Sequence, residues 1–250
     1  MPLPKLKKYL INLIFPTFCI RCHRPEKIIC NDCLKTIKPL NIQLCPLCEK
    51  TVTMNGEVCR SCQRRFHPAI DNLLVTSDYK NKLLAKSIHF LKYKFIRDLA
   101  SPLAQVLVTG LNKFKLPTPD FILPIPLHPR RLRWRGFNQA ELLSQEVSVN
   151  LLPGLTIPVI SDLVVRQKYT PPQKNIRSYK ARQENLKNAF QVNPDFNWNL
   201  NKLPKQNLTG KNILIIDDIT TTGATILNFA KELKKLHPKS ISAVVLGRQS

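Results

Sequence analysis

The chain has 250 residues, 43% of them hydrophobic, which is enough for a sizeable core in one or two domains. No apolar run reaches the roughly 18 residues of a membrane-spanning helix, and a disordered polyelectrolyte would contain far fewer apolar residues. The 39 Lys and Arg against 16 Asp and Glu give a net charge of +23 on a folded surface, which favours nucleic acid, anionic lipid or phosphorylated ligands as partners.

The first 19 residues hold three lysines and then a short apolar stretch that Pro16 interrupts. This stretch is too short and too broken for a secretory signal. Leu10, Leu13 and Ile14 share one helical face, which predicts a short amphipathic helix. We expect this helix to pack against the module that follows, with contact to a membrane surface as the alternative.

All eight cysteines lie within residues 19–62, as four pairs with the spacing C-x-x-C. The pairs are Cys19 with Cys22, Cys30 with Cys33, Cys45 with Cys48, and Cys59 with Cys62. Two residues between cysteines let both thiolates bind one ion through Zn–S bonds of about 2.3 Å. Such short loops gain little from disulfides. We therefore predict two structural zinc ions, each held by four cysteines.

The pairs that share each ion remain open at this stage. Sequential pairing joins neighbouring pairs along the chain, whereas a cross-braced arrangement joins the first with the third and the second with the fourth. His23 and His67 adjoin the cysteines, but eight thiolates already complete two sites, so we expect neither histidine to be a ligand.

A short basic connector at residues 63–68 predicts a domain boundary, with a zinc module at 1–66 and a second domain at 67–250. Apolar patterning predicts strands at 73–76, 120–125, 159–165, 189–192, 213–216 and 241–246. Helical spacing predicts helices at 83–91, 99–111, 136–149, 179–187 and 224–235, with a loop at 193–208. Alternating strands and helices predict an α/β domain with a mainly parallel sheet.

The most specific stretch is 213–225, in which a buried strand leads into two carboxylates, a hydroxyl-rich turn and a helix. Ligands of open α/β sheets bind beyond the carboxyl ends of the strands, and a turn that opens a helix offers backbone N–H groups to phosphate. Asp217 and Asp218 suit sugar hydroxyls or a magnesium ion held through water. A helix cap beside a tolerated acidic pair is the alternative interpretation. The predicted phosphate-binding residues are Thr220, Thr221, Thr222, Gly223, Ala224 and Thr225.

Two basic segments offer further anion contacts. Four arginines within 130–135 follow the predicted strand 120–125 on an expected loop, from which Arg131 and Arg135 would hold pyrophosphate. Residues 166–187 contain seven basic residues, one acidic residue and two tyrosines, a composition that suits single-stranded nucleic acid. A generally basic surface would produce the same composition. His128 would act as an acid or base, or simply pack between prolines.

The stretch 213–225 resembles the 5-phosphoribosyl-1-pyrophosphate (PRPP) motif of type I phosphoribosyltransferases. Residues 124–128 (PIPLH), the arginines that follow and 135–140 (RGFNQA) are similar to a block of the ComF/ComFC competence proteins. The family's next block resembles Arg166, Thr170, Gln173, Arg182, Asn185 and 189–190 (AF). The chain departs from the pattern at 219–220, where Ile-Thr replaces a usual Val-Leu, and in a somewhat long loop at 193–208.

The resemblance implies a type I phosphoribosyltransferase fold behind a double zinc ribbon. It further implies a protein that handles imported single-stranded DNA in natural transformation, either free in the cytoplasm or peripheral to the inner membrane. PRPP with magnesium would be its ligand, Asp217 and Asp218 its catalytic residues, and a competence helicase or DNA-loading protein its partner.

Two functions of different classes follow from these expectations. One is an enzyme that transfers phosphoribose from PRPP to a nitrogenous acceptor, as a housekeeping phosphoribosyltransferase does. The other is a DNA-handling adaptor for which PRPP is a ligand or regulator. A hood that binds the acceptor base would separate them, and either the ribbon or residues 73–114 would supply it. No Walker A sequence is present, so the chain is not expected to be an ATP motor.

Overall fold

The structure is a computed structural model that describes residues 17–169, 188–198 and 208–249. The helices expected around residue 10 and at 179–187, and most of the expected loop at 193–208, lie outside the described residues. Within the described part of the chain, no helix has the length and apolar character needed to cross a membrane.

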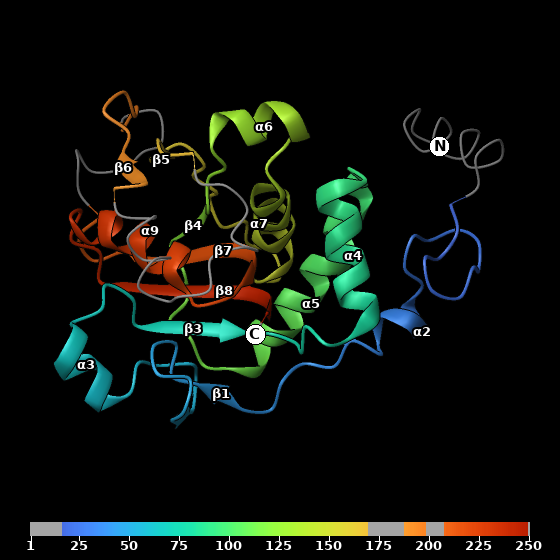
Figure 1. The fold of residues 1–250 in the computed structure, drawn as a ribbon, viewed down its shortest axis with the longest axis horizontal. Helices are drawn as coiled ribbons and strands as arrows, with labels where there is room; N and C mark the ends of the chain where they lie inside the picture. The colour runs from blue at the N-terminus through green and yellow to red at the C-terminus, as the bar shows by residue number, and fades with distance from the viewer. Residues whose placement is uncertain (1–16, 170–187, 199–207, 250) are drawn as a thin grey trace.

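A four-stranded parallel sheet forms the centre of the molecule (Figure 1). Its strands follow the order β3 (Asn72–Val75), β8 (Ser240–Arg248), β7 (Asn212–Thr220) and β4 (Phe121–Pro124). β7 and β8 are the longest strands and lie in the middle, where an unbroken apolar run is buried on both faces. The predicted α/β domain with a parallel sheet is confirmed.

Helices cover both faces of this sheet, and the alternation of side chains along β7 assigns each residue to one face. Leu214 and Ile216 pack with α4 (Lys82–Tyr93), α5 (Ala100–Lys113) and α7 (Gln139–Asn150). Ile213 and Ile215 face α9 (Ala224–Lys234) on the other side. A short 3-10 helix, η1 (Arg97–Leu99), joins α4 to α5.

The strand expected at 159–165 differs from the structure in extent and in partner. β5 covers only Val164–Arg166 and pairs antiparallel with β6 (Phe190–Val192) in a separate two-stranded sheet. Val159 contributes one isolated parallel bridge to Ile122 at the edge of the main sheet. An apolar pattern predicts an extended segment, but the sheet it joins depends on tertiary contacts.

The four arginines at 130–135 lie on a helix and not on the expected loop. α6 (Pro129–Arg135) has Pro129 at its first position, and the His128 Nδ1 caps it by accepting from the Arg130 N–H at 3.2 Å. Gly136 ends α6 with φ 75°, in the left-handed region. The helix expected from residue 136 therefore starts later, at Gln139, where the Asn138 side chain caps α7.

The cysteine-rich module covers the outer edge of β3. It contains α2 (Asn31–Leu34), the hairpin β1 (Gln43–Leu44) and β2 (Val52–Thr53), and α3 (Arg60–Phe66). The Gln43 side chain imitates a neighbouring strand, because it donates to the Val75 carbonyl and accepts from the Val75 N–H, both at 3.0 Å. The module thus protects an edge that would otherwise expose unpaired backbone groups.

Candidate functional site

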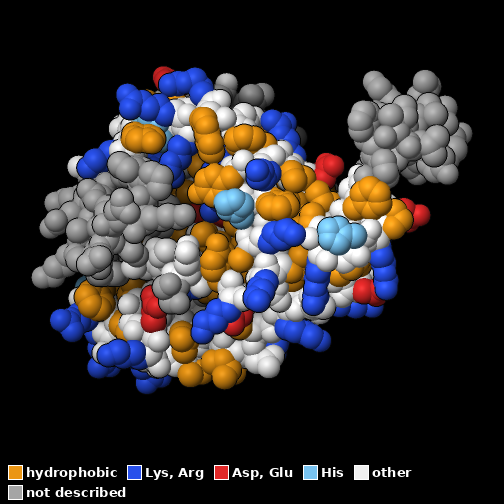
Figure 2. Space-filling view, turned by 45° about the vertical axis from the view of Figure 1, so that its right-hand side comes forward, with side chains coloured by type: hydrophobic (Ala, Val, Ile, Leu, Met, Phe, Trp, Pro, Cys, Tyr) orange, Lys and Arg blue, Asp and Glu red, His pale blue; other side chains and the backbone are white. Residues whose placement is uncertain are grey.

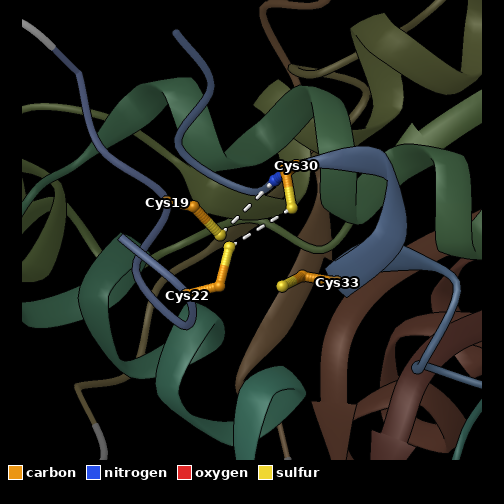
Figure 3. Close-up of side chains that lie close together, drawn as sticks. All are labelled: Cys19, Cys22, Cys30 and Cys33. Atoms are coloured by element: carbon orange, nitrogen blue, oxygen red, sulfur yellow. Dashed lines mark hydrogen bonds between the residues drawn. The ribbon is translucent and has the colours of Figure 1, made fainter. Parts of the chain in front are cut away.

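The eight cysteines form two separate tetrads. Each tetrad joins pairs that are neighbours in sequence, Cys19, Cys22, Cys30 and Cys33 in one and Cys45, Cys48, Cys59 and Cys62 in the other, and the four sulfur atoms lie within 4.8 Å of one another. Figure 3 shows the four side chains of the first tetrad converging on one point. Sequential pairing is therefore the arrangement found, and neither tetrad includes His23 or His67.

The spacing of the sulfur atoms suits zinc. The Sγ atoms of Cys22 and Cys30 are 3.5 Å apart, and those of Cys48 and Cys59 are 4.0 Å apart. Four sulfurs arranged tetrahedrally at about 2.3 Å from one ion lie roughly 3.8 Å from each other. The two observed distances lie on either side of this separation, and both exceed the S–S bond of about 2.05 Å in a disulfide.

The chemistry of the thiols also calls for a cation. Backbone N–H groups, chiefly those of Lys50 and Thr51, lower the pKa of Cys48 to about 6. Burial raises the pKa of Cys33 and of Cys62 to about 12, and the neighbouring thiols add to the effect. Four thiolates so close together repel one another, so a divalent cation is needed for all of them to ionise. The two tetrads therefore fit two structural zinc ions.

A second candidate site is a cavity of about 190 Å³ beyond the carboxyl end of β7. Six elements meet around it, as expected for a ligand site in an open α/β sheet. Its lining residues are Lys92, Ile125, Leu127, Arg131, Gln139, Arg166, 217–222, Ala224 and Thr225. Most of the polar residues predicted for the PRPP site are thus brought together in one place.

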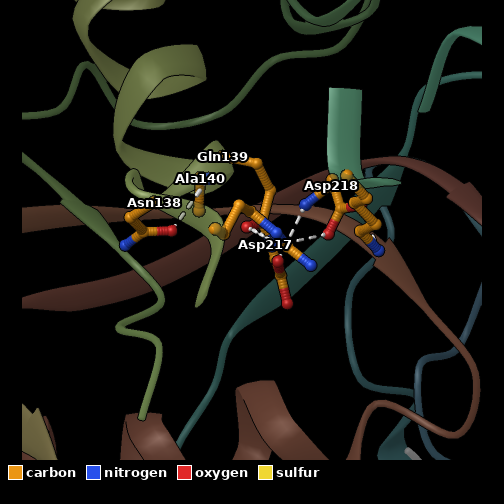
Figure 4. A network of polar contacts seen from close by, with 7 residues as sticks. Asn138, Gln139, Ala140, Asp217 and Asp218 are labelled. Atoms are coloured by element: carbon orange, nitrogen blue, oxygen red, sulfur yellow. Dashed lines mark hydrogen bonds and ion pairs between the residues drawn. The ribbon is translucent and has the colours of Figure 1, made fainter. Parts of the chain in front are cut away.

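Asp218 lies at the base of this cavity and is 2% exposed. Its carboxylate forms an ion pair with Lys92 from α4 and accepts a hydrogen bond from the Gln139 Nε2 at 3.4 Å. Arg135 donates in turn to the Gln139 Oε1. Figure 4 shows Gln139 reaching from α7 toward the two aspartates. Asp218 is therefore held by a charged network and not directed freely into solvent.

The pKa of Asp217 is shifted in the opposite direction to that of its neighbour. Burial, together with the charge of Asp218, raises the pKa of Asp217 well above its usual value. Burial also raises the pKa of Asp218. The charge and hydrogen bond of Lys92 have the opposite effect, and the pKa of Asp218 is lowered overall. The Asp218 N–H also donates to the Asp217 Oδ1 at 2.9 Å. The two carboxyls therefore ionise at different pH values, and Lys92 favours the charged form of Asp218.

The turn after β7 is built to receive an anion. Gly223 has φ 75° at the N-terminus of α9, and its N–H donates to the Thr220 Oγ1 at 3.0 Å. The Thr222 Oγ1 is buried and has no hydrogen-bond partner among the described residues. A buried polar atom without a partner is costly, and a phosphate oxygen in the adjoining cavity would satisfy it.

Two arginines line the same cavity as this turn. Arg131 reaches it from α6, and Arg166 reaches it from β5. Burial lowers the pKa of Arg166 to about 10, and the charge of Arg131 acts in the same direction. Two like charges near each other in a partly buried site favour an anion between them. Arg131 therefore lies where the sequence predicted a phosphate contact.

Arg135 is placed differently, since it supports Gln139 behind the cavity and is not one of its lining residues. Gly223 shapes the turn without lining the cavity. His128 caps α6, and its ring lies edge-on to that of Tyr169 with the centroids 5.2 Å apart. The second basic segment is described only as far as Tyr169, so its DNA-binding expectation lies largely outside the described residues.

Three polar lining residues, Lys92, Gln139 and Arg166, were not among the predicted site residues. Gln139 and Arg166 stand in sequence blocks that resemble a known family, and that resemblance was a usable signal. Lys92 had none, because it follows the apolar face of a helix far from Asp218 in the chain. Only the packing of α4 against the sheet brings its amine to the carboxylate.

The loop that carries the second cysteine tetrad contacts the turn after β7. The Pro46 carbonyl oxygen, between Cys45 and Cys48, lies 3.9 Å from the place where a Cβ on Gly223 would stand. Glu49, which follows the same pair, forms an ion pair with Arg248 of β8 at 2.9 Å. The zinc-binding loop thus packs directly behind the turn that closes the cavity.

Two family models match the chain. One describes a double zinc ribbon domain and covers residues 10–63, and the other describes a phosphoribosyl transferase domain and covers residues 138–250. Among solved structures, a purine phosphoribosyltransferase from Pyrococcus horikoshii is similar to 59% of this chain and 80% of its own, with 18% identity and a TM-score of 0.34.

Curated relatives extend over nearly the whole chain. Competence protein F of Haemophilus influenzae is 30% identical over 92% of this chain and 96% of its own length. DNA utilization protein YhgH of Escherichia coli (strain K12) is 31% identical over 88% and 92%. Competence protein ComFC of Bacillus subtilis is 26% identical over 90% and 86%. With its two cysteine tetrads and its parallel sheet, the chain belongs to the ComF family, in which a double zinc ribbon precedes a type I phosphoribosyltransferase fold.

Proposed function

We propose that this protein binds PRPP with magnesium in the cavity beyond β7 and acts in competence, in the handling of imported single-stranded DNA. The observation that supports PRPP binding is the cavity itself. It is lined by two adjacent carboxylates, by a turn whose Thr222 hydroxyl has no partner among the described residues, and by Arg131 and Arg166. The relatives' names, competence and DNA utilization proteins, support the second half.

Each group has a defined task in this proposal. The turn 220–225 holds the 5-phosphate through backbone N–H groups and hydroxyls. Asp217 and Asp218 accept from the ribose hydroxyls or hold the waters of magnesium, which would neutralise the pyrophosphate. Arg131 and Arg166 bind pyrophosphate oxygens as paired donors. Lys92 keeps Asp218 ionised until the ligand arrives.

Transfer of phosphoribose is the second step of the proposal, and a housekeeping phosphoribosyltransferase without DNA contact is the alternative function. Both use the same cavity, so PRPP affinity does not separate them. Release of pyrophosphate from PRPP, assayed with and without single-stranded DNA, does. Stimulation by DNA supports the competence role, whereas turnover that depends on a free base and ignores DNA supports the alternative.

Thr222→Val tests the phosphate turn. The hydroxyl has no partner among the described residues, so its loss removes a donor to phosphate without breaking a hydrogen bond seen in the protein. We expect PRPP affinity to fall about tenfold by calorimetry, in line with roughly 1.5 kcal/mol for a hydrogen bond to a charged group. Thr53→Val is the matched control, because the Thr53 Oγ1 is also buried and unpartnered within the described chain but lies in the ribbon hairpin. Equal PRPP affinity in both variants would place the phosphate elsewhere.

Asp217→Asn is expected to stabilise the protein and weaken PRPP binding. At neutral pH the unfolded chain ionises this carboxyl freely, whereas burial raises its pKa in the folded protein, so the charge costs stability at pH values above about 3.9. A protonated Asp217 cannot serve magnesium or a ribose hydroxyl. Wild-type affinity should therefore fall as the pH drops through the raised pKa, by up to about tenfold per pH unit.

In Asp217→Asn this pH dependence should disappear. Thermal melts and calorimetry over a pH series measure both effects, and Asp195→Asn, on the exposed loop after β6, is the control. A variant that loses stability, or that keeps the wild-type pH profile of PRPP binding, would show that Asp217 has been given the wrong role.

A further inference from the structure

Three aromatic rings lie exposed where the C-terminal end of α4 meets α6. Trp134 is 59% exposed, Tyr93 is 46% and Phe95 is 41%. The Phe95 and Trp134 rings meet edge-on with centroids 5.2 Å apart, and the Tyr93 and Trp134 centroids are 6.3 Å apart. His89 extends the group, since its ring lies 4.8 Å from that of Tyr93. We call Tyr93, Phe95 and Trp134 the aromatic platform.

The backbone at Phe95 has a conformation that is unfavourable for a bulky residue. Phe95 follows the last residues of α4 with φ 57°, in the left-handed region where glycine or asparagine is usual and a bulky residue is an outlier. Rings that only fastened α4 to α6 would be buried between them. A contiguous group of half-exposed aromatic side chains instead marks a binding surface.

The platform residues adjoin, along the chain, two residues of the network around Asp218. Tyr93 directly follows Lys92, which pairs with Asp218 inside it. Trp134 directly precedes Arg135, whose guanidinium carbon is 6.0 Å from the Trp134 ring and which supports Gln139. A molecule stacked on the platform is therefore a neighbour of the groups that surround the two aspartates.

The charge around the platform identifies the kind of ligand. Residues 82–97 and 126–140, which contain all of α4 and α6, include no acidic residue. Their basic residues are Lys82, Lys86, Lys92, Lys94, Arg97, Arg130, Arg131, Arg133 and Arg135. Figure 2 shows hydrophobic side chains interspersed with many Lys and Arg side chains and few acidic ones on one face of the molecule. Aromatic faces beside many basic side chains are complementary to unpaired bases joined by phosphates.

We propose that the aromatic platform is a base-stacking site for single-stranded nucleic acid, with bases on Trp134, Tyr93 and Phe95 and backbone phosphates along the basic side chains of α4 and α6. This inference rests on the DNA-handling half of the proposed function and is independent of PRPP binding. Stacking needs an exposed base face, so a duplex of equal charge is a poor ligand. The sequence pointed to 166–187 as the segment that suits single-stranded nucleic acid, without the rings of α4 and α6.

Tryptophan fluorescence gives a direct test, because the chain contains two tryptophans. Trp198 packs against Phe196, and Trp198→Phe leaves Trp134 as the reporter. Titration with an oligothymidylate is expected to quench this fluorescence. A duplex and an abasic oligonucleotide of the same length should bind more weakly and leave the emission unchanged.

Trp134→Ala in the wild-type background is expected to lower oligothymidylate affinity about tenfold or more. The slope of affinity against salt concentration should stay the same, because the variant loses a stacking contact and keeps every phosphate contact. Trp134→Phe should restore most of the affinity. Phe66→Ala is the control, because Phe66 is 57% exposed beside Arg65 but lies on α3 of the ribbon.

The proposal is overturned if Trp134→Ala, with an unchanged thermal melt, binds oligothymidylate as the wild type does. It is equally overturned if the abasic strand quenches Trp134 as strongly as the intact one, or if no single strand binds and the surface serves a protein partner instead. PRPP calorimetry on the same variants keeps the two proposals apart. Trp134→Ala should retain PRPP affinity. If the wild-type protein fails to bind PRPP, the assignment of the cavity is refuted but the proposal for the aromatic platform is not.

Discussion

Replacing Asp217 and Asp218 together by alanine is expected to lower PRPP affinity about a hundredfold or more, because two hydrogen-bond acceptors for the ligand, each contributing roughly 1.5–3 kcal/mol, are lost. From the sequence alone, side chains that lie beyond the end of a strand are expected to be replaceable without unfolding the domain. The structure changes that expectation for Asp218, which is buried and paired with Lys92.

Loss of Asp218 leaves the Lys92 amine, whose side chain is 14% exposed, without its counter-ion. Removing one partner of a buried ion pair costs about 3–5 kcal/mol. Asp218→Ala is therefore expected to lower the thermal midpoint sharply, which would confuse any binding measurement. Asp218→Asn combined with Lys92→Met removes both charges and keeps the volume, so it should fold with near wild-type stability.

The sharp comparison is thus between Asp217→Ala, which keeps the ion pair, and the double variant Lys92→Met with Asp218→Asn. Both should melt cooperatively and both should bind PRPP much more weakly by calorimetry in the presence of magnesium. Wild-type affinity in these two folded variants would mean that the cavity beyond β7 is not the PRPP site.

Removal of zinc is expected to have the largest effect on stability. Structural zinc sites in small peptides contribute about 10–16 kcal/mol of apparent binding free energy at pH 7, which is folding free energy. Cys19 and Cys33 of the first tetrad are buried in the same hydrophobic cluster as Leu84 and Leu103 of the second domain. Loss of that ion should therefore weaken the packing of α4 and α5 as well as the ribbon.

Loss of the second ion should act on the phosphate turn, because Pro46 packs behind Gly223. Cys45→Ser is expected to reduce PRPP affinity more than Cys22→Ser at matched temperature, with magnesium held constant. Elemental analysis should find two zinc ions in the fresh wild-type chain, and chelation should expose the ribbon to proteases. One zinc or none per chain, or a protease pattern that chelation does not alter, would contradict the two-site assignment.

The sequence alone determined the parts of this protein that depend on local pattern and spacing. The C-x-x-C pairs predicted two sites of four thiolates, because a two-residue spacer leaves few other uses for such cysteines. The unbroken apolar run before Asp217 predicted a buried parallel strand, and the hydroxyl-rich turn after it predicted an anion site. The boundary at residue 66 remains a prediction, although ribbon side chains share a cluster with the second domain.

Only the tertiary structure decided which partners complete these patterns. The cysteine spacings suit sequential pairing without excluding a cross-braced arrangement, and the folded ribbon has the sequential one. The helical state of α6 depends on a cap by His128 and on an end at Gly136, which together outweigh the loop expected from a run of arginines. Lys92 reaches Asp218, and Tyr93 reaches Trp134, because α4 and α6 pack near the same edge of the sheet. Long-range contacts of this kind leave no local periodicity in a sequence, since each depends on how separate elements meet.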